Sequence, residues 1–172
     1  MPEAHIVLDL DQTLVNDNVA RPGLSEFLHF CFSHFASVSI WTAAEPGWWS
    51  FCYNEHMVDH GFVFSRVLTR ADCDQIVQSL SYNSSLRADS LLTLKPLSKL
   101  WKDASTGMRP TNTLIVDDTP TTAAANPENL IPITAFIRGE DDALFSLMDL
   151  LELRLAQFHE TGDIRSQFSN SE

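Results

Sequence analysis

Two aspartates one residue apart, Asp9 and Asp11, follow a short apolar run near the start of the chain. The run at residues 6–8 predicts a buried β-strand. Side chains alternate along a strand, so the two carboxylates would project the same way from its end. Two carboxylates held this close repel each other unless a positive group lies between them or one of them keeps a proton. A bound metal ion with a phosphate group would meet that need, so the pair favours phosphate chemistry at a metal.

A second acidic pair, Asp117 and Asp118, ends another apolar run at residues 113–116. If the two strands are neighbours in a parallel sheet, both pairs converge in the crevice outside the carboxyl ends of the strands. Such an oxygen-rich site suits Mg²⁺, which keeps several waters and takes up substrate phosphate. Thr42 and Lys95 lie between these runs in the sequence, and their hydroxyl and ammonium groups could hold phosphate oxygens. The residue types therefore predict a magnesium-dependent phosphate site.

Apolar runs alternate with segments of helical periodicity, which predicts an α/β fold. The strands would form a Rossmann-like, doubly wound, mainly parallel sheet with helices on both faces. Pro132 places the last strand at the edge of that sheet, because proline donates no backbone hydrogen bond. We expect strands at residues 6–8, 37–42, 62–68, 113–118 and 131–137, and helices at 24–35, 48–60, 74–80, 97–104 and 143–158.

The length of 172 residues suits one domain. We assign residues 1–159 to it, with an insertion after the third strand at 71–93 and a flexible polar tail at 160–172. The loop at residues 15–20 is short and leaves no room for a large cap, so the site would stay open to a macromolecule.

Composition and charge argue against several classes of protein. The formal net charge of −12 works against nonspecific nucleic-acid binding, which depends on clustered Lys and Arg. The three cysteines form no CxxC pair, which favours a reducing compartment over a disulfide scaffold. The sequence shows no signal peptide and no apolar run long enough for a membrane span. We therefore expect a cytoplasmic or nuclear protein with no membrane contact and no direct nucleic-acid binding.

The segment from Asp9 to Leu14 reads DLDQTL and resembles the signature of haloacid dehalogenase (HAD) superfamily phosphotransferases. Within that superfamily the chain resembles the FCP/SCP-like phosphatases, which act on the C-terminal domain (CTD) of RNA polymerase II. The resemblance covers nearly everything from Ile6 to Leu155 and implies a HAD-type fold. The further segments that carry it are 21–23, 27–28, 40–44, 70–73, 95–100, 114–120 and 126–133.

The resemblance implies a role for each site residue. Asp9 would attack phosphorus and form an aspartyl-phosphate, and Asp11 would protonate the leaving hydroxyl and then activate water. Thr42 and Lys95 would bind the phosphoryl group during transfer. Mg²⁺ would be held by Asp9, the backbone carbonyl of Asp11, Asp117 and Asp118. The substrate would contact Thr13, Ala43, Trp48 and Arg70.

Three positions depart from the family pattern: Gln12 stands where a Glu is usual, Pro96 where an Asp is usual, and Asp118 where an Asn is usual. None of them removes the nucleophile, the acid or the lysine. A turn-forming role for Asp118 is the alternative to metal binding. A surface ion pair of Arg70 is likewise the alternative to binding a second phosphate.

We therefore expect a magnesium-dependent phosphatase that acts on phosphoserine or phosphothreonine in a protein substrate. The alternatives are a phosphatase for a small metabolite or a nucleic-acid end, and a catalytically silent binding module with the same fold.

Overall fold

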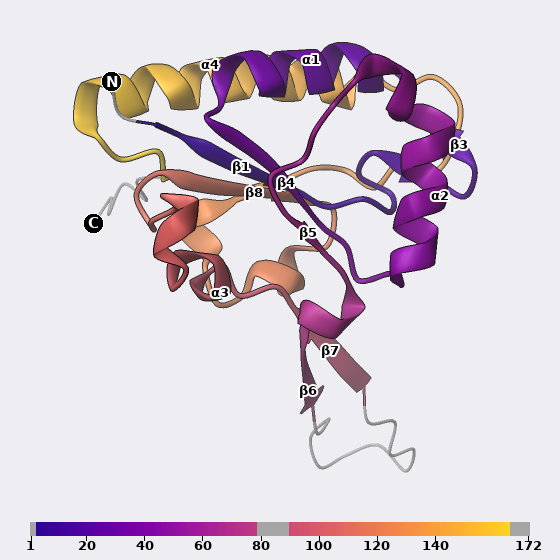
Figure 1. The fold of residues 1–172 in the computed structure, drawn as a ribbon, viewed down its shortest axis with the longest axis horizontal. Helices are drawn as coiled ribbons and strands as arrows, with labels where there is room; N and C mark the ends of the chain where they lie inside the picture. The colour runs from indigo at the N-terminus through magenta and orange to yellow at the C-terminus, as the bar shows by residue number, and fades with distance from the viewer. Residues whose placement is uncertain (1–2, 79–89, 166–172) are drawn as a thin grey trace, which may run out of the picture.

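The computed structural model describes residues 3–78 and 90–165. Five strands form one parallel sheet in the order β5-β4-β1-β8-β9 (Figure 1). Their bounds are β1 His5–Leu8, β4 Ser37–Trp41, β5 Val67–Leu68, β8 Thr113–Asp117 and β9 Leu130–Pro132. The chain runs outward from β1 to β5 and then returns to β8 on the other side of β1. The strand order therefore reverses between β1 and β8, which opens a crevice outside their carboxyl ends.

Among the described residues, four α-helices and five 3-10 helices connect and cover these strands. The α-helices are α1 Leu24–His34, α2 Pro46–His56, α3 Ser98–Trp101 and α4 Ala143–Thr161. The 3-10 helices are η1 Val58–His60, η2 Arg70–Asp72, η3 Ala104–Thr106, η4 Pro120–Ala123 and η5 Pro127–Asn129. Within the two described ranges, none of these helices combines the length and apolar character that crossing a membrane requires.

The side chains of the central strand β1 alternate between two cores. Ile6 and Leu8 are fully buried on one face of the sheet, in the core to which α1 and α4 contribute. Val7 is fully buried on the other face, in a core shared with α3 and η4. Figure 1 shows α1 and α4 together above the sheet and α3 below it. The predicted doubly wound α/β fold is confirmed, and burial on both faces explains why the strands are apolar throughout.

The helix expected at residues 48–60 begins earlier and is divided in two. Pro46 occupies the first turn of α2, where its fixed φ suits a helix start. The α-helix ends at His56 and the chain continues as η1. Gly61 then adopts a left-handed conformation with φ 69°, which ends the segment at the predicted place.

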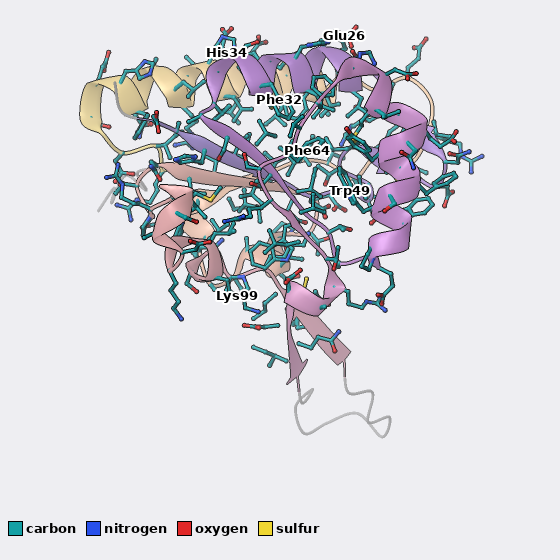
Figure 2. All side chains as sticks on the ribbon, viewed as in Figure 1. Glu26, Phe32, His34, Trp49, Phe64 and Lys99 are labelled. Atoms are coloured by element: carbon teal, nitrogen blue, oxygen red, sulfur yellow. The ribbon has the colours of Figure 1, made fainter. Side chains whose placement is uncertain are left out.

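The strand expected at residues 62–68 is much shorter: β5 comprises Val67–Leu68, and backbone hydrogen bonds to β4 begin only at Ser65. The aromatic residues before it pack between helices instead. The centroid of the Phe64 ring lies 5.3 Å from that of Phe32 in α1 and 5.3 Å from that of Trp49 in α2 (Figure 2). Rings of this size fill the gap between the two helices rather than alternate along a sheet edge.

Within the part of the chain that the structure describes, two antiparallel strand pairs lie outside the main sheet. The loop at residues 15–20 is a short hairpin of β2 (Val15–Asn16) and β3 (Val19–Ala20), as expected for a short cap. The helix predicted at 74–80 is wrong over 74–78, where β6 (Asp74–Gln78) pairs antiparallel with β7 (Ser90–Leu94); residues 79 and 80 lie outside the described residues. The pairing partner is distant in sequence, and this tertiary contact overrides the local pattern. The β6–β7 hairpin projects from the body of the molecule (Figure 1).

The C-terminal elements have bounds that differ from those expected. β9 lies at the sheet edge and ends at Pro132, where a proline is tolerated, and the expected strand at 131–137 stops early, with the Ile133 N–H donating last to the Asp117 carbonyl at 3.2 Å. The predicted domain boundary at residue 159 falls inside α4. Residues 160–165 do not form a loose tail: Ile164 is fully buried, and its N–H donates to the Thr111 carbonyl at 2.9 Å. The expected helix at 97–104 is shorter, since α3 ends at residue 101.

Candidate active site

The acidic pairs follow directly from the ends of β1 and β8. Leu8 pairs with Val116 in the register of the two strands, and the Asp9 N–H donates to the Val116 carbonyl at 2.9 Å. Asp117 is the last residue of β8, and Asp118 comes next. The structure therefore brings Asp9 and Asp117 to the same crevice, as the parallel-sheet argument requires.

Lys95 joins the two strand ends. Its ammonium lies 2.6 Å from Asp9 Oδ1 and 2.7 Å from Asp117 Oδ2. All three residues are buried, with Lys95 only 1% exposed. The backbone N–H of Lys95 donates to the Thr122 carbonyl at 2.7 Å, which fixes the chain just after β7. A buried ammonium between two carboxylates offsets the repulsion between them.

Burial governs the protonation of this group. Loss of solvent, together with the nearby charge of Asp117, raises the pKa of Asp9 to about 7, although the charge of Lys95 and its hydrogen bond lower it. Burial alone lowers the pKa of Lys95, but the charges of the two carboxylates more than offset this and raise it. Lys95 is therefore charged at neutral pH and tends to keep Asp9 ionised.

Asp11 takes part in a separate set of contacts. Its Oδ1 accepts a hydrogen bond from the Trp48 indole Nε1–H at 2.6 Å, and its Oδ2 accepts one from the Thr42 hydroxyl at 3.1 Å. Thr42 is fully buried, whereas Trp48 is half-buried. The structure thus places Thr42 and Trp48 at the site, and both contact Asp11 directly.

Asp9, Asp117 and Asp118 form an acidic cluster that could hold a cation. One carboxylate oxygen from each lies within 4.8 Å of the others. The fully buried Thr13 hydroxyl donates to Asp9 Oδ2 at 2.8 Å and lies 3.4 Å from Asp118 Oδ1. Carboxylate oxygens are the ligands that Mg²⁺ takes in proteins, so this donor set fits the expected ion.

These groups line a cavity of about 180 Å³. Four carboxylates and one ammonium among its lining residues leave a formal charge of −3 if all are ionised (four negative, one positive). A site of that charge favours the binding of cations. The lining residues are Asp9, Asp11, Gln12, Ala43, Lys95, Asp117, Asp118, Thr119 and Thr122.

Two predicted substrate residues differ in their placement. Ala43 lines the cavity, but Arg70 is not among the described lining residues. The Arg70 Nε–H donates to the Ala43 carbonyl at 3.1 Å, and its Nη1 lies 3.5 Å from Glu45 Oε1. Both of these charged side chains are more than half exposed. The alternative of a surface ion pair therefore describes Arg70 as observed.

The residues predicted for the site do not include Arg21, although segment 21–23 carries part of the family resemblance. Arg21 is 1% exposed and donates to the backbone carbonyls of Gln12, Thr13 and Thr134. Its Nε and Nη2 also bind the two oxygens of Asp141 at 2.8 and 3.0 Å. Gln12 has a left-handed φ of 61°, which a non-glycine residue adopts at some cost. Arg21 holds the turn that carries the paired aspartates.

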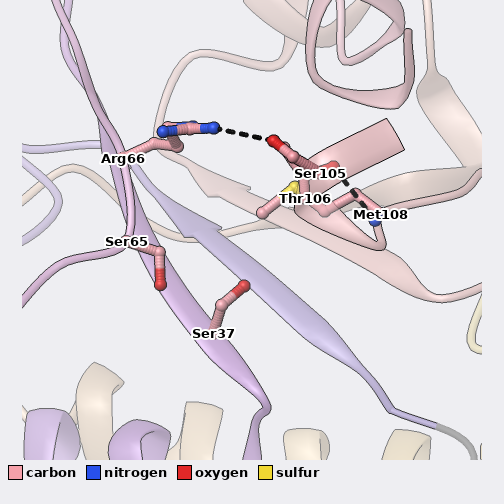
Figure 3. A pocket seen from close by; sticks show the side chains of 6 residues that line it. All are labelled: Ser37, Ser65, Arg66, Ser105, Thr106 and Met108. Carbon is pink, nitrogen blue, oxygen red and sulfur yellow. Dashed lines mark hydrogen bonds between the residues drawn. The ribbon is translucent and has the colours of Figure 1, made fainter. Parts of the chain in front are cut away.

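A second cavity, of about 220 Å³, lies at the other end of the sheet (Figure 3). Its lining includes Ser37, the first residue of β4, whereas Thr42 follows the last residue of that strand. Arg66 in its wall donates to Ser105 Oγ at 3.2 Å and to Asp103 at 2.9 Å. None of the predicted site residues lines this cavity.

The sequence profile of the NLI interacting factor-like phosphatase family matches residues 4–165. The chain belongs to this family. The match includes every residue of the acidic cluster and of the β6–β7 hairpin that the structure describes. A comparison with curated proteins gave no match in sequence.

Several solved structures have a similar fold. The structure of Fcp1, an essential RNA polymerase II CTD phosphatase, has a TM-score of 0.54 and 16% identity; the match covers 92% of this chain and 53% of that one. A fission yeast Fcp1 variant bound to beryllium fluoride has a TM-score of 0.53 and 16% identity, with 99% and 59% covered. A Listeria monocytogenes protein of unknown function has a TM-score of 0.55 and 14% identity, and the match covers 90% of this chain and 99% of that one. The chain thus spans little more than half of the two Fcp1 structures.

Proposed function

We propose that this NLI interacting factor-like chain is a magnesium-dependent phosphatase that removes phosphate from serine or threonine in proteins through an aspartyl-phosphate. The observation that carries the proposal is the buried Lys95 ammonium between Asp9 and Asp117. It holds a nucleophilic carboxylate and a metal-binding carboxylate together at the carboxyl ends of two strands. We further propose that residues 4–165 form one phosphatase domain with 71–93 as an insertion.

Asp9 is suited to act as the nucleophile. Each of its oxygens already accepts one hydrogen bond, from Lys95 at 2.6 Å and from Thr13 at 2.8 Å, and keeps a second lone pair. The carboxylate is therefore oriented before the substrate arrives. Positioning of this kind and charge neutralisation supply most of the catalysis in phosphoryl transfer.

The reaction would proceed in two steps. In the first, an Asp9 oxygen attacks phosphorus, the bond to the serine or threonine oxygen breaks, and Asp11 gives that oxygen its proton. In the second, Asp11 takes a proton from a water whose oxygen attacks phosphorus, and the bond to Asp9 breaks. Phosphate leaves, and both aspartates return to their starting states.

Asp9, the backbone carbonyl of Asp11, Asp117 and Asp118 would hold Mg²⁺. When bound, the ion supplies positive charge against the phosphate oxygens. Lys95 adds a second, permanent positive charge on the opposite side of Asp9 from Thr13. Thr42 contributes through Asp11, to which its hydroxyl donates.

A macromolecular substrate is supported by the short β2–β3 hairpin. It spans only residues 15–20, and no larger cap follows the first strand among the described residues. The Fcp1 structures with the same fold are described as CTD phosphatases, which act on a protein. We also propose that the protein acts in the cytoplasm or the nucleus.

Hydrolysis of p-nitrophenyl phosphate with and without Mg²⁺ tests the chemistry. The wild type is compared with Asp9→Asn and with Asp149→Asn, a matched change at an exposed position on α4. We expect magnesium-dependent turnover in the wild type and in Asp149→Asn, and none in Asp9→Asn. An active Asp9→Asn variant would contradict the covalent mechanism. Preference for sugar phosphates or nucleotides over a phosphoserine peptide would favour a small-molecule phosphatase.

A further inference from the structure

The contact between Trp48 and Asp11 is among the shortest in the site. The indole Nε1 lies 2.6 Å from Asp11 Oδ1, while the Thr42 hydroxyl lies 3.1 Å from Oδ2. Each carboxylate oxygen therefore has its own donor. An N–H donor this close to a carboxylate makes a charge-assisted hydrogen bond, which is stronger than a neutral one.

The two donors differ in what they permit. An indole N–H can only donate, whereas a hydroxyl can donate or accept and rotates to suit its partner. Asp11 Oδ1 accepts the indole N–H, and because the carbonyl oxygen of a protonated carboxyl group accepts better than its hydroxyl oxygen, Trp48 favours Oδ1 as the carbonyl oxygen. Asp11 Oδ2 faces Thr42, whose hydroxyl oxygen can accept from a protonated carboxyl group. A proton on Asp11 is therefore accommodated at Oδ2.

The surrounding structure holds the indole in place. Trp48 lies in the first turn of α2, and its backbone N–H donates to the Glu45 carbonyl at 3.1 Å. Its ring stacks on Phe51, one turn along, with ring centroids 5.4 Å apart and planes 18° apart. The Thr42 oxygen accepts the Ala44 N–H at 3.0 Å, which fixes the segment that leads into α2. The start of α2 thus positions both donors to Asp11.

We propose that Trp48 is a positioning residue: it fixes Asp11 Oδ1 as a permanent acceptor, so that Oδ2 carries the proton delivered to the leaving group. The inference rests on the proposed function, since it assigns the proton of the acid to one atom of Asp11. It changes the expected role of Trp48 from substrate contact to control of the acid.

The first test is the dependence of rate on the leaving group. Phenyl phosphate and p-nitrophenyl phosphate are similar in size, but phenolate is the poorer leaving group and needs the proton more. Because general acid catalysis contributes roughly 10²- to 10⁴-fold, we expect Trp48→Phe to lower kcat/KM about 30-fold on phenyl phosphate and less than about threefold on p-nitrophenyl phosphate.

The control for this test is Trp49→Phe, the neighbouring tryptophan, which packs on Phe64 instead. It should lower both values alike or not at all. An equal loss on both substrates in Trp48→Phe would overturn the inference, since a structural defect does not distinguish leaving groups.

The second test does not depend on activity. The chain has four tryptophans and therefore four indole signals in a ¹H–¹⁵N spectrum. The signal that disappears in Trp48→Phe should lie downfield of the other three, because its N–H makes the short hydrogen bond to Asp11. That signal should move upfield in Asp11→Ala and stay in place in Asp149→Asn. A signal that does not respond to Asp11→Ala would overturn the inference. If the wild type hydrolyses neither aryl phosphate, the proposed function fails and the role in catalysis fails with it, whatever the spectrum shows.

Discussion

Replacement of Arg21 by methionine removes the cation that ties the turn after β1 to the C-terminal half of the chain. The guanidinium donates to the carbonyls of Gln12 and Thr13 in that turn, to the Thr134 carbonyl after β9, and to both oxygens of Asp141 before α4. Methionine fills a similar volume but offers no donor. The change therefore tests the hydrogen bonds rather than the packing.

The magnitude follows from the burial of the pair. The Arg21 side chain is 0% exposed and that of Asp141 is 19% exposed. Removing one partner of a buried ion pair costs about 3–5 kcal/mol. Water can reach the Asp141 carboxylate that is left behind, so the lower end of that range applies. We expect a loss of about 3 kcal/mol in the free energy of unfolding.

Urea unfolding measures this loss as a change in the midpoint with an unchanged slope. The matched control is Arg66→Met, which breaks the pair with Asp103. Both side chains of that pair are nearly half exposed, at 47% and 46%. An exposed pair contributes at most about 1 kcal/mol. If the two variants lose the same free energy, or if Arg21→Met costs less than about 1 kcal/mol, the turn is not held by Arg21.

Three further predictions concern pH, the ammonium and the metal. Hydrogen bonds from Arg21 hold the pKa of Asp141 in the folded protein below its usual 3.8. The pair therefore stabilises the fold fully above pH 3.8, and this stabilisation is lost as the pH falls through the lower pKa of the folded state. The difference in unfolding free energy between wild type and Arg21→Met should therefore shrink in acid, and a constant difference would contradict it. Lys95→Met leaves two buried carboxylates unpaired and should destabilise the metal-free protein by about 3–5 kcal/mol; thermal unfolding with EDTA and with Mg²⁺ should show partial recovery with the ion. Asp117→Asn should raise the Mg²⁺ concentration for half-maximal rate at least about tenfold, since even outer-shell partners of metal ligands matter that much, and an unchanged magnesium dependence would remove Asp117 from the ligand set.

The convergence of Asp9 and Asp117 could be predicted from sequence because it needs only two facts. Both residues end apolar runs, and parallel strands end at the same edge of a sheet. The position of Lys95 followed from the family motif, but its bridge between the two carboxylates depends on burial, which the sequence does not display. The same holds for Trp48, whose aromatic type is visible while the direction of its N–H is not.

Arg21 shows why part of the site escaped prediction. Its partners Thr134 and Asp141 are 113 and 120 residues away in sequence, and no local spacing signals them. The β6–β7 hairpin is a similar case, because the pattern at residues 74–78 has meaning only beside Ser90–Leu94. Local patterns predict elements well where burial on one face decides them, and less well where a distant partner does.

The central claim is that Asp9 carries the phosphoryl group. Borohydride reduces an aspartyl-phosphate to homoserine, and mass spectrometry locates the change within the chain. Asp11→Asn should accumulate the intermediate with p-nitrophenyl phosphate, because this leaving group departs without the acid while hydrolysis still needs the base. The account predicts homoserine at position 9 in that variant, only after addition of substrate. Turnover by the wild type with no modification in the variant, or with modification at any other carboxylate, would contradict it.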